Sequence, residues 1–114
     1  MPGMPGNSIS NYFCGKLKCS GYYKGSASTK FGDWFMFDLG IMCQTICLAA
    51  HAAGLGTVVV GCFDQNKAGE IIGIPEDHEV VALIPMGYSD QQPSPPKRKE
   101  VAEFCHNNRF GSRL

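Results

Sequence analysis

The chain has 114 residues, 44% apolar and 18% charged, which is typical of one globular domain and excludes a disordered chain. Ten basic residues balance ten acidic ones, so the net charge gives no general attraction to nucleic acid or to an anionic membrane, and neither is expected as a partner. The charge is unevenly distributed, however, and residues 95–114 hold five basic side chains against two acidic ones. This basic tail is either an ordinary solvated surface or a segment that meets an anion.

The cysteines and the apolar segments indicate a cytoplasmic protein. There are six cysteines, and the opening stretch "MPGMPGNSIS" has neither the charge nor the apolar run of a secretory signal, so we expect reduced thiols. The longest apolar region, 34–63, is interrupted by Asp38, Gln44 and His51, which argues against a transmembrane helix.

Residues 1–33 are rich in Gly, Ser, Asn and Tyr and show no helical period. We predict an irregular or extended N-terminal segment with a flexible "MPGMPG" start, followed by the main domain over 34–114. Cys14 and Cys19 flank four residues, a spacing outside the usual pattern of structural zinc, so free thiols are expected there and no metal site.

A long helix is predicted next, with Asp38 as its N-terminal cap, an end near Ala53 and a left-handed C-terminal cap at Gly54. Cys43 and Cys47, four residues apart on it, are interpreted as small packed side chains. Because the helix is apolar nearly all round, it should be buried on most sides. So short a chain cannot cover it alone, and we expect a partner subunit to do so.

The remaining elements alternate in type. "TVVVGC", residues 57–62, predicts a buried strand that ends in the small pair Gly61–Cys62. A short helix should run from about Gln65, capped by Asp64, to Gly73. A second strand, 78–88, is apolar enough to be central in a sheet. A Pro-rich connector then leads to a short helix around 99–105. The fold class is therefore mixed α and β, with too few strands for a self-sufficient sheet.

Three stretches of this pattern carry a resemblance to a known family. "WFMFDLGIMCQTICLAAHAAGLGTVVVGCFD", "EIIGIPEDHEVVALIPMGY" and "KRKEVAEFCHNNRFG" resemble, in order and spacing, the C-terminal half of the FMN-dependent nitroreductases. The resemblance implies a nitroreductase-like α+β fold, here a partial sheet with a long buried helix that is completed by homodimerisation. It also implies FMN at the dimer interface, NAD(P)H as the reductant, and a small organic acceptor such as a nitroaromatic or a quinone.

The resemblance assigns residues to the cofactor. Gly61 and Cys62 stand where the family's backbone runs beside the flavin ring, and small side chains permit that approach. Arg98 aligns with an arginine that contacts the FMN phosphate, and Lys97 or Lys99 would add charge beside it. No side chain is implied as a catalytic acid or base, since the cofactor carries the chemistry, and no metal is implied.

The family's N-terminal half has no counterpart here. That half normally brings arginine and serine to the FMN phosphate, yet no arginine precedes Arg98 in this chain. The alternative is therefore a truncated dimerisation fragment of the same fold without cofactor, and whether this chain is an active enzyme stays open.

Overall fold

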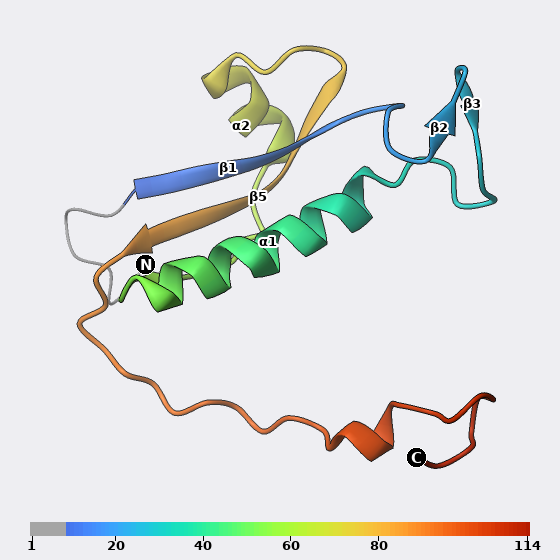
Figure 1. The fold of residues 1–114 in the computed structure, drawn as a ribbon. Coiled ribbons are helices and arrows are strands. Elements are labelled where there is room, and N and C mark those ends of the chain that lie inside the picture. Colours follow the sequence, from blue (N-terminus) through green and yellow to red (C-terminus); the bar gives the residue numbers. More distant parts are fainter. Residues whose placement is uncertain (1–8) are drawn as a thin grey trace.

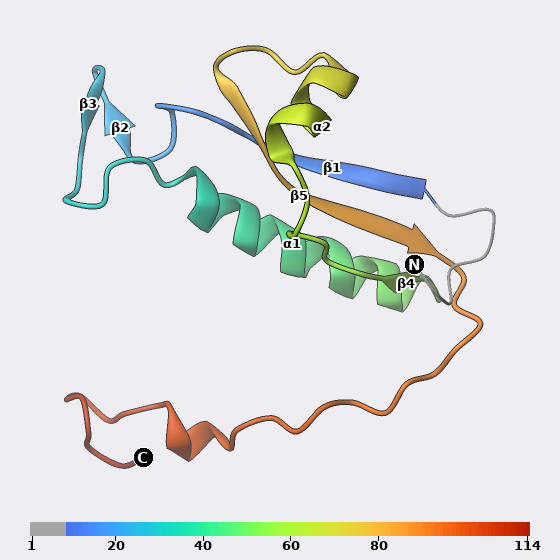
Figure 2. The same ribbon diagram turned by 180° about the vertical axis from the view of Figure 1, so that it is seen from behind.

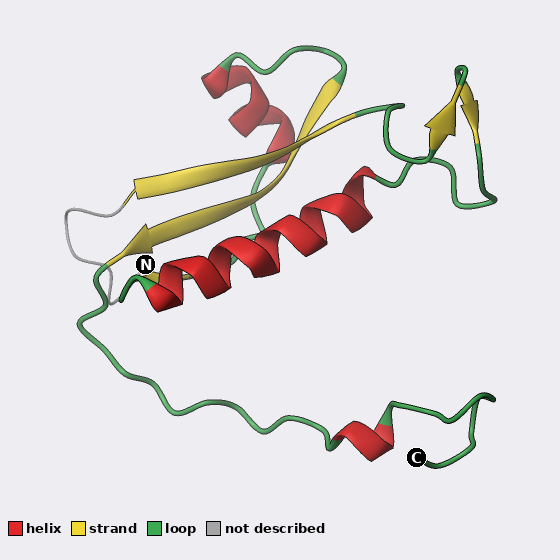
Figure 3. Ribbon diagram, viewed as in Figure 1, coloured by secondary structure: helices red, strands yellow, loops and turns green. Residues whose placement is uncertain are grey.

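The computed structural model describes residues 9–114, so the predicted flexible "MPGMPG" start lies outside the described residues. The chain builds a small α+β unit from which a long C-terminal tail departs (Figures 1 and 3). Its elements, in chain order, are β1 Ile9–Lys16, β2 Tyr22–Tyr23, β3 Ser26–Ala27, α1 Phe35–Ala52, β4 Gly56–Thr57, α2 Gln65–Ile72, β5 His78–Gly87 and the 3-10 turn η1 Val101–Glu103.

The main sheet is antiparallel, with strand order β1-β5-β4. β1 pairs with β5 from Ile9 opposite Met86 to Lys16 opposite His78, and a bulge falls between Phe13 and Cys14. The predicted strand at 78–88 is thus confirmed as β5, and it is central. The buried apolar side chains, Phe13, Ala50, Val80 and Ile84, gather where this sheet meets α1 and α2.

The segment predicted to be irregular or extended over residues 1–33 contains regular extended structure where the structure describes it. Residues 9–16 form strand β1, and β2 and β3 form a small hairpin. Strand β1 was not predicted because Ser, Asn and Gly interrupt the alternation of apolar and polar residues in this stretch. The strand forms because its backbone pairs with β5, a distant segment of the chain. Gly15 is required here, because a Cβ would lie 2.5 Å from the Phe35 ring where β1 approaches α1. The domain boundary at residue 33 stays a prediction.

Helix α1 begins four residues earlier than predicted, at Phe35 instead of Leu39. Asp38 lies in its first turn and does not cap it; the Asp33 carboxylate instead accepts hydrogen bonds from the backbone N–H of Phe35 (3.1 Å) and Lys18 (2.6 Å). The C-terminal end agrees with the prediction. Gly54 has φ +79°, its N–H donates to His51, and the N–H of Leu55 donates to Ala50, which together form a Schellman ending.

One chain covers only one side of α1. The helix packs against β1 and β4, and Ala50 is its single buried residue. Figures 1 and 2 show the sheet on one side of α1 and the tail running apart from it on the other. Large apolar side chains are more than half exposed along the helix: Met36, Phe37, Ile41, Met42 and Leu48. The predicted burial of the helix is therefore not achieved by residues 9–114 of one chain.

The same length and apolar composition would by themselves allow α1 to cross a membrane. Core helices of soluble proteins satisfy that test equally, so the signal is weak on its own.

The strand predicted for 57–62 is shorter than expected and is exposed. β4 contains only Gly56–Thr57, followed by an isolated bridge between Val60 and Leu83, and Val59 is 56% exposed. The interruption has a cause in β5. The N–H of Val58 donates to the carbonyl of Pro85, but proline has no N–H to return, so the ladder breaks at this pair.

Helix α2 agrees with the prediction at both ends. The Asp64 carboxylate accepts from the N–H of Lys67 at 3.0 Å, and Gly73 ends the helix with φ +67°. The predicted helix at 99–105 is reduced to the short turn η1, with reciprocal capping between Glu100 and Glu103. The tail before it is extended, so no lateral packing supports a longer helix.

Candidate functional site

The loop Gly61–Cys62 connects the sheet to α2 and is anchored on both sides. Before it, Val60 and Leu83 exchange backbone hydrogen bonds of 2.8 and 2.9 Å. After it, Asp64 caps the first turn of α2. The exposed residues Gly61 and Cys62 therefore lie between two anchored points, Val60 in the sheet and Asp64 at the start of α2, which limits how the loop can move.

The loop presents free backbone on an open surface. A Cβ added to Gly61 would meet no heavy atom within 4 Å. Within residues 9–114, the backbone N–H groups of Gly61 and Cys62 donate no hydrogen bond. The carbonyl of Gly61, in contrast, accepts a hydrogen bond from the Nε2 of Gln65 at 2.9 Å. A flat ligand carrying an acceptor atom could therefore approach the backbone here without displacing a side chain.

Gln65 was missed by sequence reasoning, which placed it only as the first residue of a helix. A glutamine at a helix start has no distinctive sequence signal, and the hydrogen-bond partner of Gln65 is a backbone carbonyl. The contact therefore becomes visible only in the folded loop.

The structure does not bring the predicted phosphate-binding residues to this loop. Lys97, Arg98 and Lys99 are exposed in the extended tail. In both ribbon views, α2 and the tail lie on opposite sides of α1 (Figures 1 and 2). Within one chain, the loop leads into α2 on one side of α1 and the basic residues lie in the tail on the other side, so the structure does not bring the two groups together.

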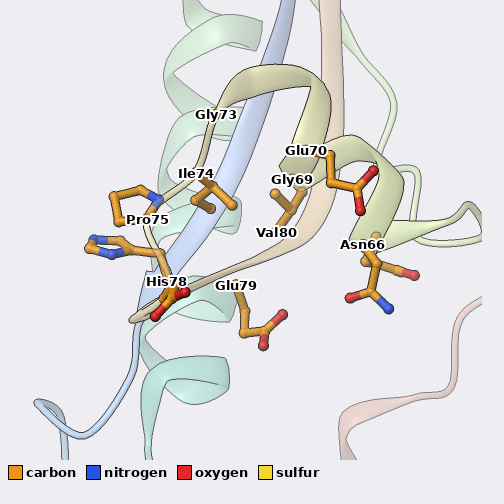
Figure 4. A pocket seen from close by; sticks show the side chains of 11 residues that line it. Asn66, Gly69, Glu70, Gly73, Ile74, Pro75, His78, Glu79 and Val80 are labelled. Carbon is orange, nitrogen blue, oxygen red and sulfur yellow. The ribbon is translucent and has the colours of Figure 1, made fainter.

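A hollow of about 460 Å³ lies between α2 and the start of β5 (Figure 4). Glu70, Glu76 and Glu79 line it, and neither Lys nor Arg does. Beside it, a 2.7 Å hydrogen bond with the His78 ring lowers the pKa of the Asp77 carboxyl. This acidic surface disfavours a phosphate, so the hollow does not replace the predicted site.

The six cysteines are all free thiols in the structure. Burial raises the pKa of Cys14; for Cys43 burial acts first, and the neighbouring Cys47 adds to the rise. Among residues 9–114, no three His, Cys, Asp or Glu side chains gather as metal ligands would.

These differences predict the order of thiol alkylation. Cys19 and Cys62 are exposed, whereas Cys14 and Cys43 are partly buried with raised pKa values and hold less thiolate at a given pH. With limiting iodoacetamide at pH 8 and no flavin added, peptide mass spectrometry should show Cys19 and Cys62 modified first. Denaturant should equalise the rates; a native Cys43 that reacts as fast as Cys19 would contradict the prediction.

Known proteins resemble this chain over the segment that contains α1, the Gly61–Cys62 loop, α2 and β5. The sequence model of the nitroreductase family matches residues 18–88, more than half of the chain. An NADPH-flavin oxidoreductase of Vibrio harveyi is 35% identical over 75 residues, covering 64% of this chain and 31% of the relative. A putative NADH dehydrogenase/NAD(P)H nitroreductase of Methanothermobacter thermautotrophicus is 33% identical over 72 residues, covering 60% of this chain and 38% of the relative. The chain thus spans about a third of the length of these curated relatives.

Solved structures agree with the fold. The NADPH:FMN oxidoreductase of Vibrio harveyi complexed with NAD+ superposes with a TM-score of 0.62 at 31% identity, over 69% of this chain and 35% of that one. A nitroreductase family protein of Clostridium difficile 630 reaches a TM-score of 0.70 at 20% identity, over 89% of this chain and 59% of that one, which speaks for the fold alone. The segment of α1, β4, α2 and β5, with the loop between β4 and α2, lies inside the matched residues, and on this evidence the chain belongs to the nitroreductase family.

Proposed function

We propose that the chain is a flavin-dependent oxidoreductase of the nitroreductase type, which uses FMN and NAD(P)H to reduce nitroaromatic or quinone-like acceptors in the cytoplasm. The curated relative from Vibrio harveyi is named an NADPH-flavin oxidoreductase, and its structural counterpart an NADPH:FMN oxidoreductase. When bound, FMN supplies the redox chemistry, namely reduction by NAD(P)H and reoxidation by the acceptor.

The observation that carries the proposal is the Gly61–Cys62 loop. Its open face and its two N–H groups, which have no acceptor within residues 9–114, suit a flat heterocycle that approaches the backbone and not a side chain. Backbone donors held between an anchored strand residue and a capped helix would orient such a ring with little rearrangement. The chain's own part is thus to bind and orient the cofactor, with no side chain assigned as acid or base.

The phosphate end of the cofactor requires a second copy of the chain under this proposal. Lys97, Arg98 and Lys99 suit a phosphate, but the tail that carries them lies on the opposite side of α1 from α2, the helix that follows the loop. A homodimer in which each tail crosses to the other subunit would pair one chain's loop with its partner's basic cluster. The tail also exposes Val101, Phe104 and Phe110, apolar side chains that gain by packing on a second subunit.

Titration of the purified protein with FMN tests the proposal. We expect fluorescence quenching with one FMN per subunit, and a dimer mass by light scattering. Arg98→Gln should weaken FMN binding by roughly tenfold or more, because a hydrogen-bonded charge on phosphate contributes about 1.5–3 kcal/mol. Arg113→Gln, which removes the same charge elsewhere in the tail, is the matched control and should change affinity less than about twofold.

The alternative is a truncated dimerisation fragment without cofactor. It is favoured by the absence of any arginine before Arg98 and by the small share of the relatives' length that the chain spans. A protein that is dimeric but neither binds FMN nor oxidises NAD(P)H would support it and would exclude the oxidoreductase proposal for this chain. A stable monomer would contradict both.

A further inference from the structure

The peptide group between Gly61 and Cys62 has one end held and one end free. Its carbonyl accepts from the Nε2 of Gln65 at 2.9 Å, while the N–H of Cys62 has no acceptor within residues 9–114. No cis peptide bond occurs in the described chain, so this unit is trans, and its C=O and N–H point in opposite directions. Fixing the carbonyl therefore fixes the direction of the N–H.

Gln65, which holds the Gly61 carbonyl, lies close to the loop in sequence. It is the first residue of α2 and lies four residues after Gly61. The Asp64 cap, which accepts from Lys67, holds the helix start and with it the backbone of Gln65. The side chain reaches back to the loop carbonyl, and it leaves the space beside Gly61 open, because a Cβ there would meet no heavy atom within 4 Å.

We infer that Gln65 is a positioning residue for the proposed flavin site: by holding the Gly61 carbonyl, it turns the N–H of Cys62 away from α2 as a preset hydrogen-bond donor. The inference rests on the proposed function. Without Gln65 the peptide can rotate and offer its carbonyl to the ligand, and a ligand acceptor atom would then have to reorder the loop before it could bind. The one side-chain hydrogen bond of Gln65 within residues 9–114 goes to the loop carbonyl, so Gln65 is not a catalytic residue.

The test compares two neighbouring substitutions of similar shape. Gln65→Met keeps the side-chain length but removes the donor, and Asn66→Leu does the same at the next position, where the amide makes no hydrogen bond within residues 9–114. We expect Gln65→Met to weaken FMN binding about three- to tenfold, the loss expected for one hydrogen bond. Asn66→Leu should change it less than twofold. Thermal unfolding checks that both variants remain folded.

A second readout does not depend on flavin. In the protein without FMN, loss of the hydrogen bond should shift the carbonyl ¹³C resonance of Gly61 in Gln65→Met but not in Asn66→Leu. If the wild type binds FMN and both variants bind it equally well, or if the Gly61 resonance does not respond to Gln65→Met, the inference is overturned while the proposed function stands. A wild type that fails to bind FMN overturns the proposed function, and the inference falls with it.

Discussion

Gly61→Val is expected to weaken FMN binding by at least about tenfold while leaving the fold intact. The glycine backbone is not in the left-handed region, and a Cβ would meet no heavy atom within 4 Å, so a side chain here starts in open space and needs no left-handed backbone. Its side chain would instead occupy the surface on which we propose that the flavin ring lies. Overfilling a packed contact typically costs about 1–3 kcal/mol, and each 1.4 kcal/mol is a factor of ten in the dissociation constant.

A graded series separates this steric effect from unfolding. Gly61→Ala should fall between the wild type and Gly61→Val in FMN affinity, measured by flavin fluorescence. All three proteins should unfold at nearly the same temperature, since the added atoms face open space in the folded chain. Wild-type affinity in Gly61→Val would refute the placement of the ring at this loop.

Ile84→Ala is expected to cause the largest loss of stability of any single truncation in the sheet. Ile84 is fully buried in the central strand β5, next to the Leu83 that holds Val60 and so anchors the loop. Truncating a buried isoleucine costs about 2–5 kcal/mol through lost burial and the cavity left behind. Since domains are stable by only about 5–15 kcal/mol, a substantial population should unfold under mild conditions.

Urea unfolding followed by circular dichroism measures the effect. Ile71→Ala in α2 is the matched control, because the same atoms are removed from a side chain that is 72% exposed. We expect the control to lower the free energy of unfolding by less than about 1 kcal/mol. Equal losses in the two variants would mean that the core does not centre on β5.

Local elements with strong signals were predictable from the sequence. Helix α2 begins at an aspartate and ends at a glycine, and both caps act within one turn of the chain. Strand β5 is nearly continuously apolar, so its central place follows from its composition. The resemblance also used short stretches of sequence. The family membership it implied is confirmed, whereas its assignment of Gly61, Cys62 and Arg98 to the cofactor stays a prediction.

Elements that depend on a distant partner were not predictable in this way. Strand β1 mixes polar and apolar residues without clear alternation, and it forms because β5 pairs with it across some seventy residues. The strand at 57–62 was predicted too long because its own apolar residues do not indicate which residues face it. Pro85 on the facing strand has no N–H to donate, and the pairing breaks there. The start of α1 was misplaced because Asp33, which also binds the N–H of Lys18, holds the chain before Asp38 can act as a cap.

The sequence by itself determined the family, the two caps of α2, the central strand and the small residues of the candidate site, because each rests on local chemistry. Only the tertiary structure decided that Gln65 holds the Gly61 carbonyl, that α1 keeps an exposed apolar side, and that the basic tail lies away from the loop. Each of these features depends on the distance between residues in the folded chain, which their separation in the sequence does not determine. That separation of loop and tail is why the proposed flavin site calls for a second copy of the chain.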